Sequence, residues 1–168
     1  MIRPAVFADI MQIVTLLKAA HLRSPKYATR ATFDDKRCRD ALFNAIKLHG
    51  AKIEGGTWCV VEEDKGVIAG FLFAMTARVE DFAVELLATD WKFYVAPGAD
   101  VSVATGLRDE FIRWAECQPK VIEMYVGVHD VLDEDFERAG ALWLRRGFRK
   151  TGALYEKFIV RESARGVA

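Results

Sequence analysis

Several acidic or imidazole side chains lie in or beside two segments with the residue pattern of β-strands, 86–95 and 121–128. The candidates are Glu85, Asp90, Glu123 and His129. A carboxylate or an imidazole acts as a general base when it lies within hydrogen-bond reach of the proton that it removes. Most single acids on strands are instead solvated or paired with a cation, so both interpretations remain open for these residues.

A second chemical feature is the start of a predicted helix at Val101. The first N–H groups of a helix have no partner within it, and with the helix dipole they favour an anion such as phosphate. The groups available are the N–H groups of 101–105 and the hydroxyls of Ser102 and Thr105. Asp100 directly precedes them, and as an N-cap it would bind a helix N–H and place a negative charge there. The segment is either an anion site or a well-capped structural helix.

The cysteines, the densest basic run and His49 give weaker indications of function. The cysteines Cys38, Cys59 and Cys117 are odd in number and lack CxxC spacing, so we expect buried, reduced thiols. The run 145–150 is the densest basic cluster; it could bind a phosphate group or a polyanion, or only end a helix. His49 follows a predicted helix, and we expect a structural role for it.

Composition restricts the class of protein. The chain has 168 residues, 52% hydrophobic and 29% charged, which indicates a globular protein and suits a single domain over residues 1–168. Lys plus Arg equals Asp plus Glu at 24 each, so no overall charge favours nucleic acid or a membrane surface. The longest apolar run, 67–77, is far shorter than the ~20 residues that span a bilayer. We expect a cytoplasmic protein without a signal peptide.

Hydrophobic periodicity predicts the elements that position these residues. Helices are predicted from Ile10 to Ser24, from a capping box at Thr32 to about Leu48, in the segment between Gly98 and Pro119, and from Asp133 to Arg146. Strands are predicted at Ile2, 57–62, 67–79, 86–95, 121–128, 148–151 and 154–160. The hairpin closed by the turn 63–66 is the clearest strand signal.

Three stretches carry a resemblance to a known family. Residues 2–5 and 8–10 look like a first strand and helix, 93–97 is similar to the end of a fourth strand, and 139–148 is similar to a helix followed by Gly-Phe. In this order they resemble the GNAT superfamily of acyl-CoA N-acyltransferases. The resemblance implies an α+β fold with a mixed, mostly antiparallel central sheet of about seven strands flanked by about four helices.

The resemblance also implies acetyl-CoA (coenzyme A) as co-substrate. Its amide-like pantetheine arm would pair with a strand edge, and its pyrophosphate would lie at the helix start. The implied cofactor-binding residues are Tyr94, Val95, Val101, Ser102, Val103, Ala104, Thr105 and Gly106. Asp90 is the implied base, since family members often carry one on this strand, and no metal is expected. The segment 21–33 resembles the variable region that shapes the acceptor pocket.

Two departures from the family pattern bear on activity. The family's loop carries Arg or Gln and then alternating glycines, whereas 98–106 retains only Gly98 and Gly106. A tyrosine that protonates the leaving thiolate in many members is replaced by Trp143, whose indole N–H is not a usable acid. We expect Trp143 to pack in the core, and the acid would be water, Tyr155 or Tyr94.

Two functions are therefore compared. The first is an N-acetyltransferase in which an amine of a small molecule or peptide attacks acetyl-CoA directly. The second is a ligand-binding or regulatory module that kept the fold and lost the cofactor. Neither nucleic acid nor a membrane is expected as a partner, and a homodimer is left open.

Overall fold

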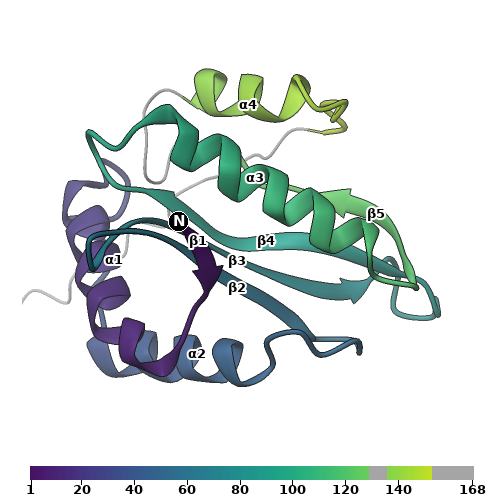
Figure 1. The fold of residues 1–168 in the computed structure, drawn as a ribbon, viewed down its shortest axis with the longest axis horizontal. Helices are drawn as coiled ribbons and strands as arrows, with labels where there is room; N and C mark the ends of the chain where they lie inside the picture. The colour runs from purple at the N-terminus through teal and green to yellow at the C-terminus, as the bar shows by residue number, and fades with distance from the viewer. Residues whose placement is uncertain (129–135, 153–168) are drawn as a thin grey trace, which may run out of the picture.

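A computed structural model describes residues 1–128 and 136–152 of the chain (Figure 1). The strands are β1 (Ile2–Pro4), β2 (Thr57–Asp64), β3 (Val67–Arg78), β4 (Leu86–Val95) and β5 (Val121–Tyr125). The helices are α1 (Ile10–Arg23), α2 (Asp35–Lys47), α3 (Val101–Glu116) and α4 (Phe136–Leu144), with a short 3-10 turn at Phe7–Asp9. The fold is α+β, as predicted.

The strands form one sheet in the order β1-β2-β3-β4-β5. Every neighbouring pair is antiparallel except β4 and β5, which are parallel. A parallel pair requires a crossover, and α3 provides it. Figure 1 shows α1 and α2 on one face of the sheet and α3 and α4 on the other.

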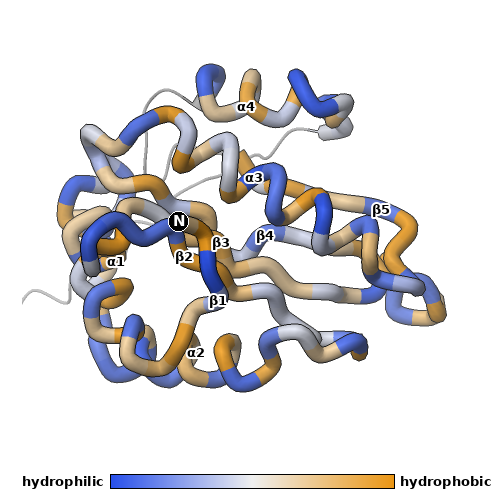
Figure 2. The backbone as a smooth tube through the Cα atoms, viewed as in Figure 1, coloured by the Kyte–Doolittle hydropathy of each residue, from blue (hydrophilic) through white to orange (hydrophobic). Residues whose placement is uncertain are grey.

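Alternation along β3 gives the sheet an apolar surface on both faces. Phe71 and Phe73 pack with α1 and α2, while Leu72 and Ala74 pack with α3. All four side chains are buried, as expected for a central strand covered on both sides. Figure 2 shows hydrophobic and hydrophilic residues mixed along the helices, which is typical of helices with one face turned to a core.

The predicted hairpin is confirmed, and its turn has a clear cause. β2 and β3 are joined through Lys65 and Gly66, whose φ angles are 50° and 82°. Both values lie in the left-handed region, which a two-residue type I′ turn requires. Glycine adopts it without steric cost.

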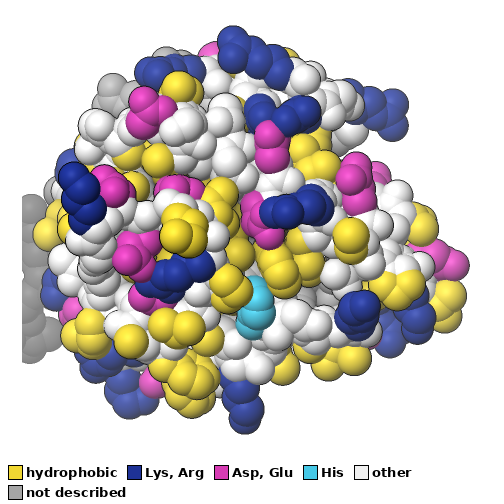
Figure 3. All heavy atoms as spheres, viewed as in Figure 1, with side chains coloured by type: hydrophobic (Ala, Val, Ile, Leu, Met, Phe, Trp, Pro, Cys, Tyr) yellow, Lys and Arg dark blue, Asp and Glu magenta, His cyan; other side chains and the backbone are white. Residues whose placement is uncertain are grey.

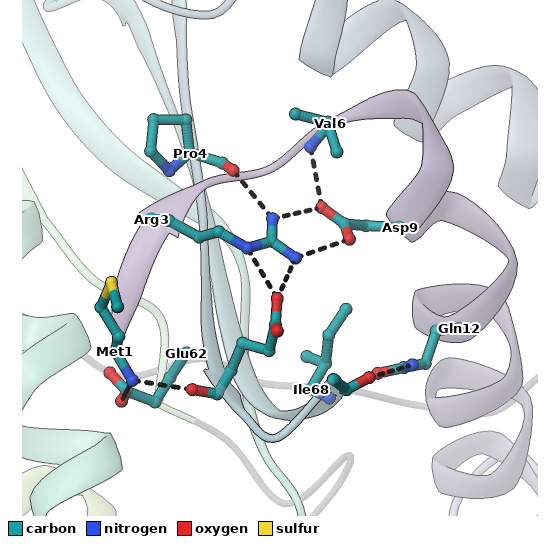
Figure 4. Close-up of polar contacts among 10 residues, drawn as sticks. Met1, Arg3, Pro4, Val6, Asp9, Gln12, Glu62 and Ile68 are labelled. Atoms are coloured by element: carbon teal, nitrogen blue, oxygen red, sulfur yellow. Dashed lines mark hydrogen bonds and ion pairs between the residues drawn. The ribbon is translucent and has the colours of Figure 1, made fainter.

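Near the amino terminus, one guanidinium joins three elements (Figure 4). Arg3 donates two hydrogen bonds to Asp9, at 2.8 and 2.9 Å, and also binds Glu63 of β2. The Arg3 side chain holds the pKa of the Asp9 carboxyl below its usual range, against the opposing effect of burial. The Asp9 carboxylate also accepts a hydrogen bond from the Val6 N–H. The network fixes β1 and the start of α1 to the sheet.

Some sequence predictions are corrected. Only five strands are present in the described ranges, because 148–151 is irregular and the predicted strand 154–160 lies outside the described residues. The N-cap of α2 is Asp34, which accepts a hydrogen bond from the Arg37 N–H at 3.0 Å, so the capping box at Thr32 is wrong. The Cys59 thiol is buried as predicted, but Cys38 is half-buried and Cys117 is exposed because it follows the last turn of α3.

Candidate active site at the end of β4

The site is built around the place where β4 and β5 separate. β4 pairs with β3 along its whole length, from Leu86 to Val95. It pairs with β5 only from Leu86 to Thr89. The second half of β4 therefore has one edge that no described strand covers, and the backbone of Tyr94 and Val95, predicted to hold the pantetheine arm, lies along it.

Asp90 lies at the point of separation. Its Oδ1 atom accepts a hydrogen bond from the N–H of Gly127, just beyond β5, at 2.9 Å. Trp91, the next residue, is an extra residue relative to β3, because Phe73 pairs with Lys92 and Ala74 pairs with Asp90. Such a bulge bends a strand and changes the direction of nearby side chains, and bulges are common next to active sites. His129, another candidate base, lies outside the described residues.

Tyr94 and Val95 present their side chains to opposite faces of the sheet. The Tyr94 ring is buried on the α1 side and stacks on Phe71 with centroids 5.3 Å apart. Its hydroxyl accepts a hydrogen bond from Arg23, at the end of α1, at 3.1 Å. Val95 packs in the cluster on the α3 side. The backbone of these two residues thus lies at the edge, between two different environments.

The connection from β4 to α3 is a tight turn. The N–H of Ala99 donates to the carbonyl of Ala96 at 3.1 Å, and Gly98 has φ 79°. A proline followed by a residue with positive φ is typical of a type II turn. Asp100 follows at once as the N-cap, so few backbone groups remain available to surround a large anion.

Asp100 accepts hydrogen bonds from two N–H groups in the first turn of α3. Its carboxylate accepts a hydrogen bond from the Ser102 N–H at 2.8 Å, and its carbonyl accepts one from the Val103 N–H at 3.0 Å. The bond from Ser102 lowers the pKa of the Asp100 carboxyl below its usual value. The capped-helix interpretation therefore describes this structure, and a negative charge lies where an anion would approach.

The predicted cofactor residues on α3 differ in their exposure. Val103 is buried, and Gly106 is so close to β1 that an added Cβ would lie 3.0 Å from Ile2 Cδ1. The Thr105 hydroxyl donates to the Ser102 carbonyl at 3.1 Å within the helix. Of the predicted set on α3, only Val101 and Ser102 are exposed. The structure brings this segment next to the end of β4, but Val103 and Gly106 are in close contact with the sheet and the Thr105 hydroxyl bonds within the helix.

Comparison with solved structures identifies the architecture. The chain is similar to a ribosomal-protein-alanine N-acetyltransferase from Brucella melitensis, with TM-score 0.68, 18% identity and coverage of 90% of this chain and 86% of the other. It is similar to an aminoglycoside 6'-N-acetyltransferase from Acinetobacter haemolyticus, with TM-score 0.65, 15% identity and coverage of 96% and 99%. The fold is that of the GNAT acyltransferases.

The same fold is shared with a protein of a different description. A transcriptional regulator from Bacillus halodurans matches with TM-score 0.68, 15% identity and coverage of 95% of this chain and 99% of the other. Neither a protein-family model nor a curated protein matches the sequence. At these identities the likeness concerns the GNAT fold.

The residue at the GNAT tyrosine position is part of the core. Trp143 is 4% exposed, which confirms the packing prediction. Its ring contacts Phe93 and Phe111 with centroids 5.8 Å away, and Phe148 at 5.2 Å. This aromatic cluster occupies the space between α4, α3 and the end of β4, on the α3 side of the open edge.

The sequence interpretation missed Arg108, a cation on the apolar side of α3 in this GNAT fold. Arg108 is 6% exposed, and its guanidinium donates to the Leu142 carbonyl at 2.9 Å and to Asp109 at 2.7 Å. Asp109 also accepts from Arg146. Burial would raise the pKa of the Asp109 carboxyl, but the two guanidinium groups outweigh it and the pKa is lowered. These contacts tie α4 to α3; the available signal was that residues 103, 107, 108 and 111 share one helical face.

A cleft of about 910 Å³ runs along β5. Its described lining comes from β5, the end of α3, α4, the segment 146–152 and Lys26 of the loop after α1. Part of the predicted basic cluster, Arg149 and Lys150, faces it, and so does Tyr125, whose pKa is raised by its hydrogen bond to Glu123. The cleft was not predicted, because it depends on segments far apart in the sequence.

Two further observations concern ligands and environment. Within 1–128 and 136–152, no group of three or more His, Cys, Asp or Glu side chains is placed to hold a metal ion. No helix in the same ranges is long and apolar enough to cross a membrane. Figure 3 shows acidic and basic side chains intermixed on one face of the molecule.

Proposed function

We propose that this protein is an N-acetyltransferase that transfers the acetyl group of acetyl-CoA to the amine of a small molecule or peptide. The observation that carries the proposal is the open edge of β4 beyond Thr89, next to the start of α3. An extended amide-like chain can add to such an edge by backbone hydrogen bonds. The structural likeness to two N-acetyltransferases supports the same chemistry.

The proposed reaction is a direct displacement. The amine nitrogen attacks the thioester carbonyl, a C–N bond forms and the C–S bond breaks, and the sulfur leaves as a thiolate that takes a proton. We assign the backbone of Tyr94 and Val95 to hold the pantetheine arm. We assign the Asp90 carboxylate, which the Gly127 N–H holds at the end of β5, to accept the proton of the amine.

The fit of acetyl-CoA to the chain is uneven. The edge of β4 suits the pantetheine arm, whereas the start of α3 suits the pyrophosphate poorly because Asp100 binds the Ser102 N–H and adds a negative charge. We therefore propose weak phosphate contacts at Val101 and Ser102. Thermal shift and calorimetry with acetyl-CoA test the proposal directly. We expect stabilisation at millimolar concentration, because a ligand that binds only the folded state raises its stability, and no stabilisation would contradict the proposal.

Asp90→Asn isolates the role of the base. The asparagine side-chain oxygen can still accept the Gly127 N–H, so the strand geometry is retained while basicity is lost. We expect kcat/KM for amine acetylation to fall by about 10²-fold or more, with acetyl-CoA binding unchanged. If Asp90→Asn is as active as the parent protein and only Asp90→Ala loses activity, Asp90 has a structural role alone.

A second candidate function rests on Asp100 and Trp143. A capped α3 and a buried indole at the tyrosine position describe a GNAT fold that binds a ligand or partner without transfer. The likeness to a transcriptional regulator is compatible with it. Coenzyme A that co-purifies with the protein, detected by mass spectrometry of the small molecules released on denaturation, would count against this alternative.

A further inference from the structure

The open edge of β4 can be approached by an acceptor from one side more easily than from the other. On the α3 side, Trp143, Phe93 and Phe111 are in ring contact. Trp143 is almost fully buried, so the space left on this side is the cleft along β5, whose lining includes Lys26 of the loop after α1. On the α1 side, the Tyr94 hydroxyl lies beside the exposed guanidinium of Arg23. The acceptor therefore approaches past Arg23.

This approach is basic. The segment 21–33 contains three cationic residues, Arg23, Lys26 and Arg30, and no Asp or Glu. Lys26 also lines the cleft along β5, which connects this segment with the site. Lys92 of β4 lies over the Trp91 ring, with Nζ 6.0 Å from the ring centroid, at the bulge.

Four acids of the neighbouring elements have partners other than Arg23. Asp34 caps α2, and Asp35 binds Lys18 at 2.8 Å. Asp90 binds the Gly127 N–H, and Glu123 hydrogen-bonds to Tyr125. Among the described residues, the Arg23 guanidinium donates to the neutral Tyr94 hydroxyl and forms no ion pair with a carboxylate.

We propose that the acceptor is an amine that also carries a carboxylate, such as a free amino acid or an acidic peptide, and that Arg23 binds this carboxylate. The inference rests on the proposed transferase function and names its substrate class. A guanidinium presents its donors in a planar fork that matches a carboxylate. Tyr94 accepts from one Arg23 nitrogen, which fixes the fork beside the β4 edge and leaves its other donors for the acceptor. A polycationic amine such as an aminoglycoside would be repelled by the same residues.

The test compares three acceptors that differ in charge. They are glutamate, the diamide of glutamate, in which both carboxylates are replaced by neutral amides, and the aminoglycoside kanamycin. We expect a KM for glutamate at least about tenfold below that for the diamide, the ratio expected for a charge-assisted hydrogen bond, and no detectable transfer to kanamycin. Arg23→Gln should abolish the preference with little change in kcat, because glutamine can still donate to the Tyr94 hydroxyl. Arg23→Lys should keep part of it.

Arg78→Gln is the matched control. Arg78 is another exposed arginine, at the end of β3, where it binds Glu54, and its substitution should leave the preference intact. Equal KM values for glutamate and the diamide, or an equal loss for both in Arg23→Gln, would overturn the inference. Failure of the transferase proposal is recognised separately, by absence of stabilisation with acetyl-CoA. In that case calorimetry with glutamate and the diamide alone decides the inference, since only tighter binding of glutamate supports it.

Discussion

At the scale of single residues, Asp100 separates the two candidate functions. Its carboxylate accepts a hydrogen bond from the Ser102 N–H, so this N–H of α3 needs no external anion as a partner. The same carboxylate adds a negative charge beside the open β4 edge. The sequence alone left an anion site and a capped helix as alternative interpretations, because both need a helix that begins at Val101. The choice depends on the orientation of one carboxylate, which periodicity does not determine.

Asp100→Asn should improve acetyl-CoA binding. Asparagine is as good an N-cap as aspartate, so the helix start is retained while the charge is removed. We expect the Kd for acetyl-CoA, measured by calorimetry, to fall about two- to fivefold, which matches the usual size of a charge effect at a helix end. Asp34→Asn at the α2 start is the control, because it makes the same change away from the site. Equal Kd values in both variants and the parent would place the phosphates elsewhere.

His49 predicts a pH dependence of stability. Its Nδ1 accepts a hydrogen bond from the Cys59 N–H at 3.0 Å, and its ring stacks on Trp58, so the expected structural role holds but the ring is neutral. Burial lowers the pKa of His49. The unfolded chain therefore takes up the proton first, and the contribution of His49 is complete above about pH 6.5 and is lost as the pH falls below it.

Urea unfolding at pH 7.5 and pH 5.5 measures this effect. The parent protein should lose up to about 1 kcal/mol more on acidification than His49→Asn, whose side-chain oxygen accepts the same N–H without titrating. Identical losses in the two proteins would assign the acid sensitivity to other groups.

At the scale of elements, the close packing of α3 on the sheet depends on a glycine. A Cβ at Gly70 of β3 would lie 2.8 Å from Val103 Cγ1 and 3.0 Å from the Tyr94 carbonyl. The apolar stripe of α3 was predictable from the positions of Leu107, Phe111 and Trp114. The requirement for glycine opposite that stripe was not, because it arises from the approach of two distant segments.

Gly70→Ala should destabilise the protein by about 1–3 kcal/mol, the usual cost of overpacking a core. The strain falls between β3 and α3, so a shift of α3 away from the β4 edge should accompany it. Gly140→Ala in α4 is the control: apart from its own helix, no atom of the described residues lies within 4 Å of its added Cβ, and alanine is the better helix former by up to about 1 kcal/mol. Guanidinium unfolding of both variants measures the change in the free energy of unfolding, which should be negative for Gly70→Ala and positive for Gly140→Ala. Equal stabilities would show that α3 adjusts without cost.

At the scale of the whole molecule, local pattern predicted the elements better than their pairing. Four helices and the first five strands follow from periodicity, since each depends on neighbouring residues. The separation of β4 from β5 and the cleft along β5 depend on contacts between distant segments. Arg108 was missed for the same reason: its partner, the Leu142 carbonyl, is far away in the sequence.

The three cysteines report on the integrity of the whole fold. Cys117 is exposed, Cys38 is half-buried, and burial raises the pKa of the Cys59 thiol to about 12. At pH 8 a thiol reagent should label Cys117 quickly and Cys38 more slowly, whereas Cys59 should react only when the sheet opens. The time course of Ellman's reagent, with and without denaturant, measures this order. Three fast thiols in the native protein would contradict the packing of β2.

The hydrogen bond between Asp90 and Gly127 has a spectroscopic consequence. A glycine amide bound to a carboxylate is a single, assignable signal in a ¹⁵N correlation spectrum, and its position is sensitive to the charge of its acceptor. Any event at the fork between β4 and β5, whether protonation of Asp90 or arrival of a ligand beside its carboxylate, alters that charge. In ¹⁵N-labelled protein, one amide proton thus gives a continuous view of the site during a titration, with no turnover required.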